Sequence, residues 1–186
     1  MYLAVCEGST FTGYGSLTEM RGERSLAKAL ILGYGNVDRQ DDGVAWHVLA
    51  GLCRKLDRKI PASPDDEFEN TGVSPDLNFV LQVTPELAET IAAYDRVCFV
   101  DAHTGSVPED LHKSVVKPEY QSSPFTHHMT PATCLSFVKT IYQHEVEGYL
   151  ISVRGYEFGF SHELSTATAR FADLAVEEIY LWLNRS

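Results

Sequence analysis

The chain has 186 residues, 44% of them hydrophobic, and carries a formal net charge of −11. This length suits one well-packed domain and is short for two. The negative charge, without any basic stripe, excludes a nucleic-acid-binding surface, which needs cationic side chains to release counterions. No apolar run reaches the length of a transmembrane helix, so membrane insertion is not expected.

Residues 1–26 are rich in Gly, Ser, Thr and Glu and show no periodicity. We interpret them as a loose N-terminal extension ahead of a single α/β domain over residues 27–186. The short apolar start has no cationic segment before it, so a signal peptide is not expected and the protein is expected to be cytoplasmic. Free thiols in a reducing compartment are also indicated, because no Cys-x-x-Cys pair occurs among the four cysteines: Cys6, Cys53, Cys98 and Cys134.

Strand and helix signals alternate along the rest of the chain. The apolar run Ala29–Leu32 is predicted to be a buried strand, and Val44–Leu56 an amphipathic helix. Phe79–Val83 is predicted to be a short strand. Thr84-Pro85-Glu86 then predicts a helix to about Ala93, because it supplies an N-cap, a proline at the first helical position and an acid in the first turn.

The second half continues this alternation. Val97–Val100 is a continuous apolar run, typical of a central parallel strand. Ser114–Val116 is predicted to be a short strand, Thr130-Pro131 to begin a helix to about His144, and Tyr149–Val153 to be the last strong strand. Ser165 caps a predicted final helix with apolar residues at helical spacing: Ala167, Phe171, Leu174, Ala175, Ile179 and Trp182. The order predicts a three-layer α/β fold, with a twisted, mostly parallel sheet of about five strands and helices on both faces.

The most informative segment is the turn from Gly33 to Gly43, between the first predicted strand and helix. It begins like a dinucleotide-binding fingerprint, but Asp38 stands at the third glycine position and two adjacent acids would repel a pyrophosphate. Asp41 or Asp42 is expected to cap the following helix. A cap needs only one carboxylate, so capping does not explain both. Since ligands bind beyond the carboxyl ends of strands, this acidic turn indicates a metal ion instead.

Further candidate ligands follow strands or precede helices. Asp42 follows the first predicted strand, Asp101 ends the central one with His103 close behind, and His127-His128 stand just before a predicted helix. Because the carboxyl ends of parallel strands lie at one edge, Asp42 and Asp101 are expected to face a common crevice that a histidine could complete. Two carboxylates and one imidazole suit a borderline divalent ion such as zinc or nickel.

Gly33-x-Gly35-Asn36 with Asp41-Asp42-Gly43 resembles the signature of hydrogenase maturation proteases, the endopeptidases that trim the C-terminus of the large subunit of NiFe hydrogenases. The similarity covers about residues 28 to 184. Three more segments resemble the family's second acidic motif, its histidine motif and its closing segment: Val100-Asp101-Ala102, Thr126-His127-His128-Met129-Thr130, and Gly155–Gly159 with Glu163–Ser165.

The resemblance implies a peptidase that contacts nickel carried by its substrate, the immature large subunit. Residue by residue, the metal-contacting and catalytic positions fall on Asp42, Asp101 and His127, with His128 as the alternative to His127. Many members carry Glu at the position of Asp42, so the side chain of this protein is one methylene shorter there. Zinc or another divalent ion could replace nickel, and we expect a monomer. The remaining motif residues are expected to contact the substrate: Gly33, Gly35, Asn36, Gly43 and His128.

No serine or cysteine nucleophile is indicated, since Cys98 lies within a strand and Cys134 within a helix, and no His-Glu-x-x-His motif occurs. The substrate's own ion would then fix the scissile bond and polarise its carbonyl or a water. Two alternatives stay open. One is a hydrolase that holds its own zinc with the same three residues; the other is a non-enzymatic, nickel-checking chaperone that binds the immature subunit without cutting it.

Overall fold

The computed structural model describes residues 27–120 and 129–185. The predicted extension over residues 1–26 and the histidines His127 and His128 lie outside the described residues. Within them, no helix is long and apolar enough to cross a membrane. Three of the four cysteines are described, and all three are free and buried: Cys53, Cys98 and Cys134.

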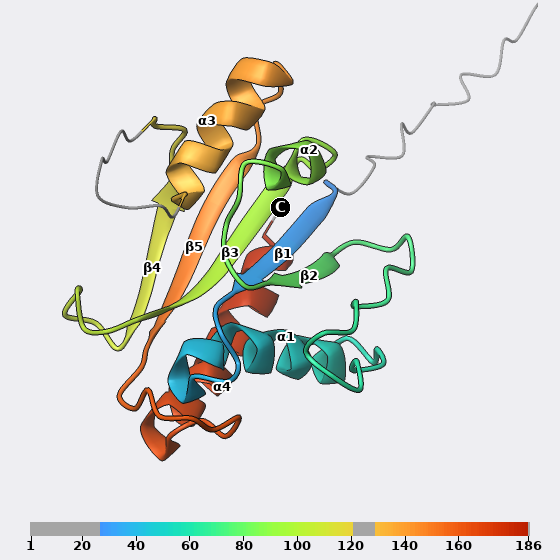
Figure 1. Cartoon of the computed structure of the whole chain (residues 1–186). Coiled ribbons are helices and arrows are strands. Elements are labelled where there is room, and N and C mark those ends of the chain that lie inside the picture. The colour runs from blue at the N-terminus through green and yellow to red at the C-terminus, as the bar shows by residue number, and fades with distance from the viewer. Residues whose placement is uncertain (1–26, 121–128, 186) are drawn as a thin grey trace, which may run out of the picture.

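The described chain forms a five-stranded sheet in the order β2-β1-β3-β5-β4 (Figure 1). Every neighbouring pair is parallel except β4 with β5, which is antiparallel. The predicted twisted, mostly parallel sheet is therefore confirmed. Its strands are β1 (Ala29–Tyr34), β2 (Asp76–Val80), β3 (Arg96–His103), β4 (Leu111–Val116) and β5 (Glu147–Arg154).

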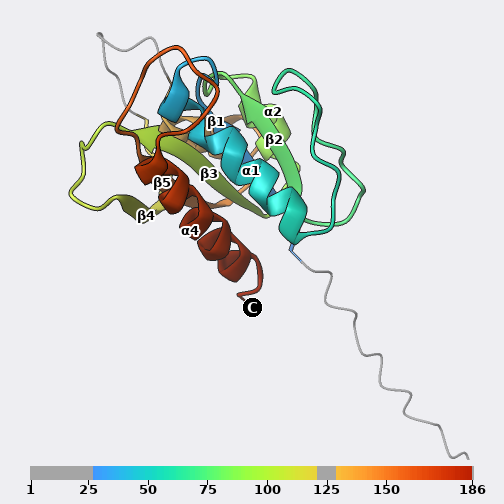
Figure 2. The same cartoon turned by 90° about the horizontal axis from the view of Figure 1, so that it is seen from below.

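Helices cover both faces of this sheet. The helices α1 (Val44–Lys55) and α4 (Thr166–Leu183) lie side by side across one face (Figure 2), where Lys55 and Glu177 form an ion pair of 2.6 Å. The opposite face carries α2 (Leu87–Ile91) and α3 (Pro131–Ile141). Each layer has its own core, which confirms the three-layer architecture.

The apolar run in β1 forms a strand because both of its faces are covered. Ala29 and Ile31 pack into the core beneath α1 and α4, and Leu30 and Leu32 pack into the other core. Side chains alternate between the faces of a strand, so a strand buried on both sides needs a continuous apolar sequence. The N-caps predicted for α3 and α4 are confirmed, since Thr130 and Ser165 accept hydrogen bonds from backbone N–H groups three residues later.

Several predicted boundaries and one predicted face are wrong. The strand β4 begins at Leu111 rather than Ser114, and α3 ends at Ile141 rather than near His144. The strand β2 begins at Asp76 rather than Phe79, because it pairs with β1 from Leu30↔Asp76 to Tyr34↔Val80 and β1 then ends. The helix α2 begins at Leu87, after a turn in which the Leu87 N–H donates to the Thr84 carbonyl (3.2 Å). On α4, the predicted Ala175, Ile179 and Trp182 are buried, but Leu174 is 51% exposed. The buried side also includes Thr168, Ala172 and Val176.

Candidate functional site

The structure places Asp42 and Asp101 at the same edge of the sheet. The strands β1 and β3 are adjacent and parallel, and their pairing ends at Gly33↔Val100. Asp101 lies one residue beyond that pair, while β3 continues alongside β5 to His103. Asp42 lies on the 3-10 helix η1 (Gln40–Gly43), in the connection that leaves β1 at this edge. The negative charge of Asp42 acts on the Asp101 carboxyl and contributes to its raised pKa.

Asp42 is held by the turn that precedes it. The Asn36 N–H donates to Asp42 Oδ2 (2.9 Å), and the Asn36 side-chain oxygen accepts from the Asp38 N–H (2.9 Å). Among the described residues, the bond from the Asn36 N–H is the single hydrogen bond to the Asp42 carboxylate. Asp42 itself is half-buried. Its other lone pairs are therefore available to a cation or to a substrate.

The glycines of the first motif shape this turn. Gly35 has φ +143°, and a Cβ there would collide with the Asp42 carbonyl oxygen. A Cβ on Gly43 would lie 2.6 Å from the Cα of Val37. Gly33 is buried, and a Cβ on it would lie 3.0 Å from Leu49 of α1. Gly35 and Gly43 therefore need glycine because backbone atoms approach closely, whereas Gly33 only packs tightly against side chains. That Gly33, Gly35, Asn36 and Gly43 contact a substrate stays a prediction.

The prediction that Asp41 or Asp42 caps α1 is wrong. Gly43 is the N-cap of α1, and no side chain bonds to the free N–H groups there. The Asp41 carboxylate is fully buried and turns toward the distant segment that follows β5. Five groups of that segment lie within hydrogen-bonding distance of it, at 2.7 to 2.9 Å: the N–H groups of Tyr156, Glu157 and Ser165, and the hydroxyls of Ser165 and Thr168.

These contacts make Asp41 a charged anchor. Burial disfavours its ionisation, but the hydrogen bonds from Glu157, Ser165 and Tyr156 outweigh this effect and hold the pKa of Asp41 below its ordinary value. Backbone bonds reinforce the attachment, because the Gln40 N–H donates to the Ser161 carbonyl (2.8 Å) and the Asp41 N–H to that of Glu157 (3.1 Å). The turn that carries Asp42 is thereby fixed to the start of α4.

Asp101 has the opposite electrostatic character. Burial raises the pKa of its carboxyl to about 7, and the Asp42 charge adds to that shift, while hydrogen bonds from Tyr34 and the Ala102 N–H oppose it. The Ala102 N–H lies 2.7 Å from Asp101 Oδ1. A carboxyl that titrates near neutral pH at a strand edge marks a candidate functional position.

The predicted third ligand falls outside the described residues, since both His127 and His128 do. Within the described residues, no group of three His, Cys, Asp or Glu side chains could hold a metal ion. His103 does not join the two aspartates. It is 8% exposed, its Nδ1 accepts from the Gly105 N–H (3.2 Å), and burial and the nearby Arg154 charge lower its pKa.

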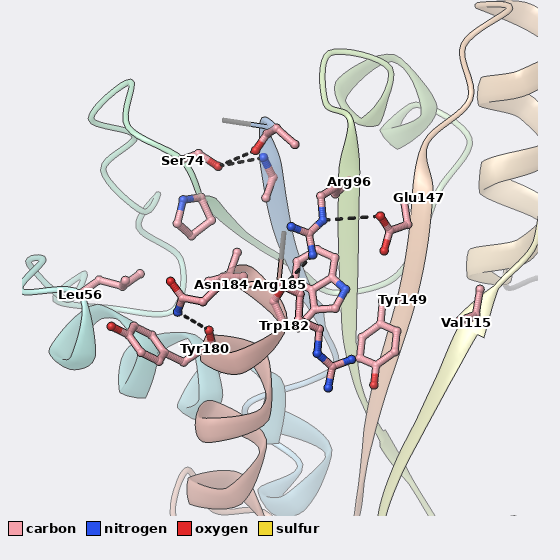
Figure 3. A pocket seen from close by; sticks show the side chains of 14 residues that line it. Leu56, Ser74, Arg96, Val115, Glu147, Tyr149, Tyr180, Trp182, Asn184 and Arg185 are labelled. Atoms are coloured by element: carbon pink, nitrogen blue, oxygen red, sulfur yellow. Dashed lines mark hydrogen bonds and ion pairs between the residues drawn. The ribbon is translucent and has the colours of Figure 1, made fainter. Parts of the chain in front are cut away.

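A cavity of about 1030 Å³ lies at the opposite, amino edge of the sheet (Figure 3). Arg96 dominates it: its guanidinium lies 4.0 Å from the Trp182 ring centroid, and its Nε lies 3.7 Å from Glu147 Oε2. Tyr149 also stacks on the Trp182 ring, with ring centroids 5.9 Å apart. Among the described lining residues, Glu147 is the single carboxylate beside two guanidinium groups, those of Arg96 and Arg185, so the cavity does not offer the pair of carboxylates found at the carboxyl edge.

No protein-family model and no curated protein sequence matches the chain. Solved structures do match it. One is the NiFe hydrogenase maturation protease HycI from Thermococcus kodakarensis KOD1, with a TM-score of 0.57 and 23% identity over 87% of this chain and 96% of that chain. HybD from Thermococcus kodakarensis, also a NiFe hydrogenase maturation protease, gives a TM-score of 0.57 and 15% identity over 84% and 99%.

A third match is the hydrogenase maturating endopeptidase HybD from E. coli, with a TM-score of 0.56 and 18% identity over 84% of this chain and 91% of that chain. These proteins are covered almost completely, so the likeness extends over whole domains rather than a shared sheet fragment. The chain has the fold of the hydrogenase maturation proteases.

Proposed function

We propose that this protein is an endopeptidase that removes a C-terminal peptide from the nickel-loaded large-subunit precursor of a NiFe hydrogenase. The observation that carries the proposal is the meeting of Asp42 and Asp101 at the carboxyl edge of a sheet that has the maturation-protease fold. In open α/β sheets, ligands bind at this edge. The solved structures HycI and HybD are named as NiFe hydrogenase maturation proteases, which supports the same activity here.

In this proposal, Asp42 and Asp101 contact nickel that the precursor carries. Asp42 offers lone pairs that no described group uses. Asp101 must lose its proton to bind the ion, and a divalent cation beside it favours that loss, because an opposite charge stabilises the ionised form. Asp41 bears no such role, since the start of α4 and the preceding segment occupy its carboxylate.

His127 is proposed as the third contact, with His128 as its alternative. The helix α3, which begins three residues after His128 at Pro131, packs on the face of the sheet that also carries Tyr34. Asp101 lies on that face too, because it follows Phe99 at the two-residue repeat of β3. The described start of α3, which follows the histidine motif in the sequence, therefore supports this proposal.

Docking on the nickel fixes the scissile bond beside the carboxylates. Holding the scissile bond in place removes the need for a chance encounter between the reacting groups. The ion would polarise the carbonyl of that bond or a water. Cleavage would then follow only after nickel insertion. We further propose that the enzyme acts as a monomer in the cytoplasm.

Mass spectrometry of a nickel-loaded precursor, incubated with the purified protein, tests the proposal. Wild-type protein is expected to release one C-terminal peptide, and Asp42→Asn to release none. Asp38→Asn is the matched control, because Asp38 belongs to the same turn but contacts the exposed His162 (2.7 Å) instead of facing Asp101. An unchanged precursor mass with the wild-type protein, together with a stable complex, would instead support the chaperone alternative.

A further inference from the structure

Two tyrosine–aspartate hydrogen bonds bracket the sheet. At the carboxyl edge, Tyr34 donates to the Asp101 carboxyl. At the amino edge, the Tyr94 hydroxyl donates to Asp76 Oδ2 (2.8 Å), where β2 begins. The pairs have the same chemistry, but only one contains a proposed nickel contact. The Tyr34–Asp101 pair is therefore the candidate for a role at the site, and the Tyr94–Asp76 pair is its control within the same protein.

The position of Tyr34 follows from the sheet. Tyr34 is the last residue of β1 and packs partly against the core under α2 and α3. The neighbouring β3 places Asp101 one residue beyond Val100, the partner of Gly33. Tyr34 and Asp101 are thus neighbours on one face of adjacent strands, and the Tyr34 hydroxyl meets a carboxyl on a half-buried residue.

The Asp101 carboxyl is thereby held at two points. Its Oδ1 accepts from the Ala102 N–H (2.7 Å), and the Tyr34 hydroxyl supplies the second hydrogen bond. Removing the hydroxyl would leave the backbone N–H alone, which permits the side chain to rotate about its bond to the main chain. A metal-contacting carboxylate with a fixed orientation binds its ion more tightly, because less freedom is lost on binding.

We propose that Tyr34 is a positioning residue: its hydroxyl orients Asp101 toward the nickel of the precursor without touching the ion itself. This inference rests on the proposed function and assigns a specific group to its site. Tyr34→Phe keeps the ring and its packing and removes only the donor. Partners of this kind commonly change metal affinity or activity by about 10- to 100-fold when they are removed.

The test compares Tyr34→Phe with Tyr94→Phe in the full chain. The first readout needs no precursor: Ni²⁺ is added to the free protein, and the paramagnetic loss of the Ala102 amide signal is followed by NMR. For Tyr34→Phe, we expect the midpoint to move to about 10-fold higher Ni²⁺. Tyr94→Phe is expected to keep the wild-type midpoint. The second readout is cleavage of the loaded precursor, where Tyr34→Phe is expected to lower kcat/KM about 10-fold.

The two readouts separate the possible failures. If the wild-type protein leaves the precursor uncut, the proposed function fails, while the Ni²⁺ midpoints still decide the role of Tyr34. Equal midpoints for wild type and Tyr34→Phe, or no loss of the Ala102 signal in the wild type, would overturn the positioning role. An equal loss of Ni²⁺ affinity in Tyr34→Phe and Tyr94→Phe would also overturn it, because a loss shared with the control indicates a general loss of structure. Thermal unfolding of both variants would detect that loss.

Discussion

Asp41 and Asp42 are neighbours in sequence and opposites in environment. Asp41 is fully buried, with five polar groups of the segment after β5 around its carboxylate. Asp42 is half-buried and accepts one hydrogen bond among the described residues, from the Asn36 N–H. A carboxylate whose lone pairs are filled by the fold stabilises the fold, and one whose lone pairs are left open can bind a ligand.

The contrast explains why the motif contains two acids. Asp41 attaches η1 to the start of α4, and that attachment fixes the backbone that carries Asp42. On this 3-10 helix, Asp41 stabilises the fold and the adjacent Asp42 is proposed to bind the ligand. Substitution of Asp41 should therefore lower the free energy of unfolding, and substitution of Asp42 should lower the rate of cleavage.

The largest effect is expected for Asp42→Asn. The amide retains the shape of the side chain but loses the charge that the nickel requires, so cleavage of the loaded precursor should fall by about 100-fold or more. The free energy of unfolding should change by less than about 1 kcal/mol, because one neutral donor is affected. Mass-spectrometric rates and urea unfolding measure the two quantities. A loss of stability as severe as that of Asp41→Asn would contradict the division of roles.

A comparable loss of activity is expected for His127→Ala. If His127 completes the nickel contact, processing should be abolished, while the unfolding free energy should stay within about 0.5 kcal/mol of wild type. His128→Ala is the matched comparison and should retain more activity than His127→Ala, because His128 is expected to contact the substrate but not the nickel. Loss of activity in His128→Ala alone would transfer the role to that neighbour, and equal loss of stability and activity in His127→Ala would indicate a packing residue.

Asp41→Asn should act on stability. An amide presents one acceptor and two donors to a site built entirely from donors, so several hydrogen bonds to a buried charge are lost together. We expect the unfolding free energy to fall by about 3 kcal/mol, measured by urea unfolding. Cleavage should fall only as far as the folded fraction falls. Wild-type stability in Asp41→Asn would show that the network contributes nothing to the fold.

The smallest effect concerns the ionisation of Asp101. Its pKa of about 7 means that the carboxyl is protonated below neutral pH and ionised above it, and the Asp42 charge is one cause of this shift. Asp42→Asn removes that charge, so the pKa of Asp101 should move down, as measured by ¹³C NMR of the side-chain carboxyl. An unchanged pKa would mean that the two carboxylates lie too far apart to share an ion.

The sequence predicts the strands and helices well because the patterns that specify them lie within a few neighbouring residues. A continuous apolar run such as Ala29–Leu32 requires cover on both faces, and Thr130 and Ser165 cap helices through bonds to residues only three positions away. The start of β2 depends instead on its register against β1, which its own residues do not encode.

The candidate site shows the same limit. The placement of Asp42 and Asp101 at one edge follows from parallel strands alone, and the structure places them there. The role of Asp41 depends on Ser165, 124 residues away, so a local reading assigned it to the nearest helix. The signal that could have identified Tyr34 is its position at the end of a strand, on the face that Asp101 shares in the neighbouring strand.

The most direct test of the central claim is the dependence of cleavage on the nickel of the substrate. The enzyme is treated with a chelator, freed of it, and mixed with loaded or nickel-free precursor, and the products are weighed by mass spectrometry. The account predicts cleavage of the loaded precursor at the untreated rate, without added metal, and no cleavage of the nickel-free form. Abolition of cleavage by prior chelation of the enzyme, with restoration by zinc, would contradict it and establish the zinc hydrolase alternative.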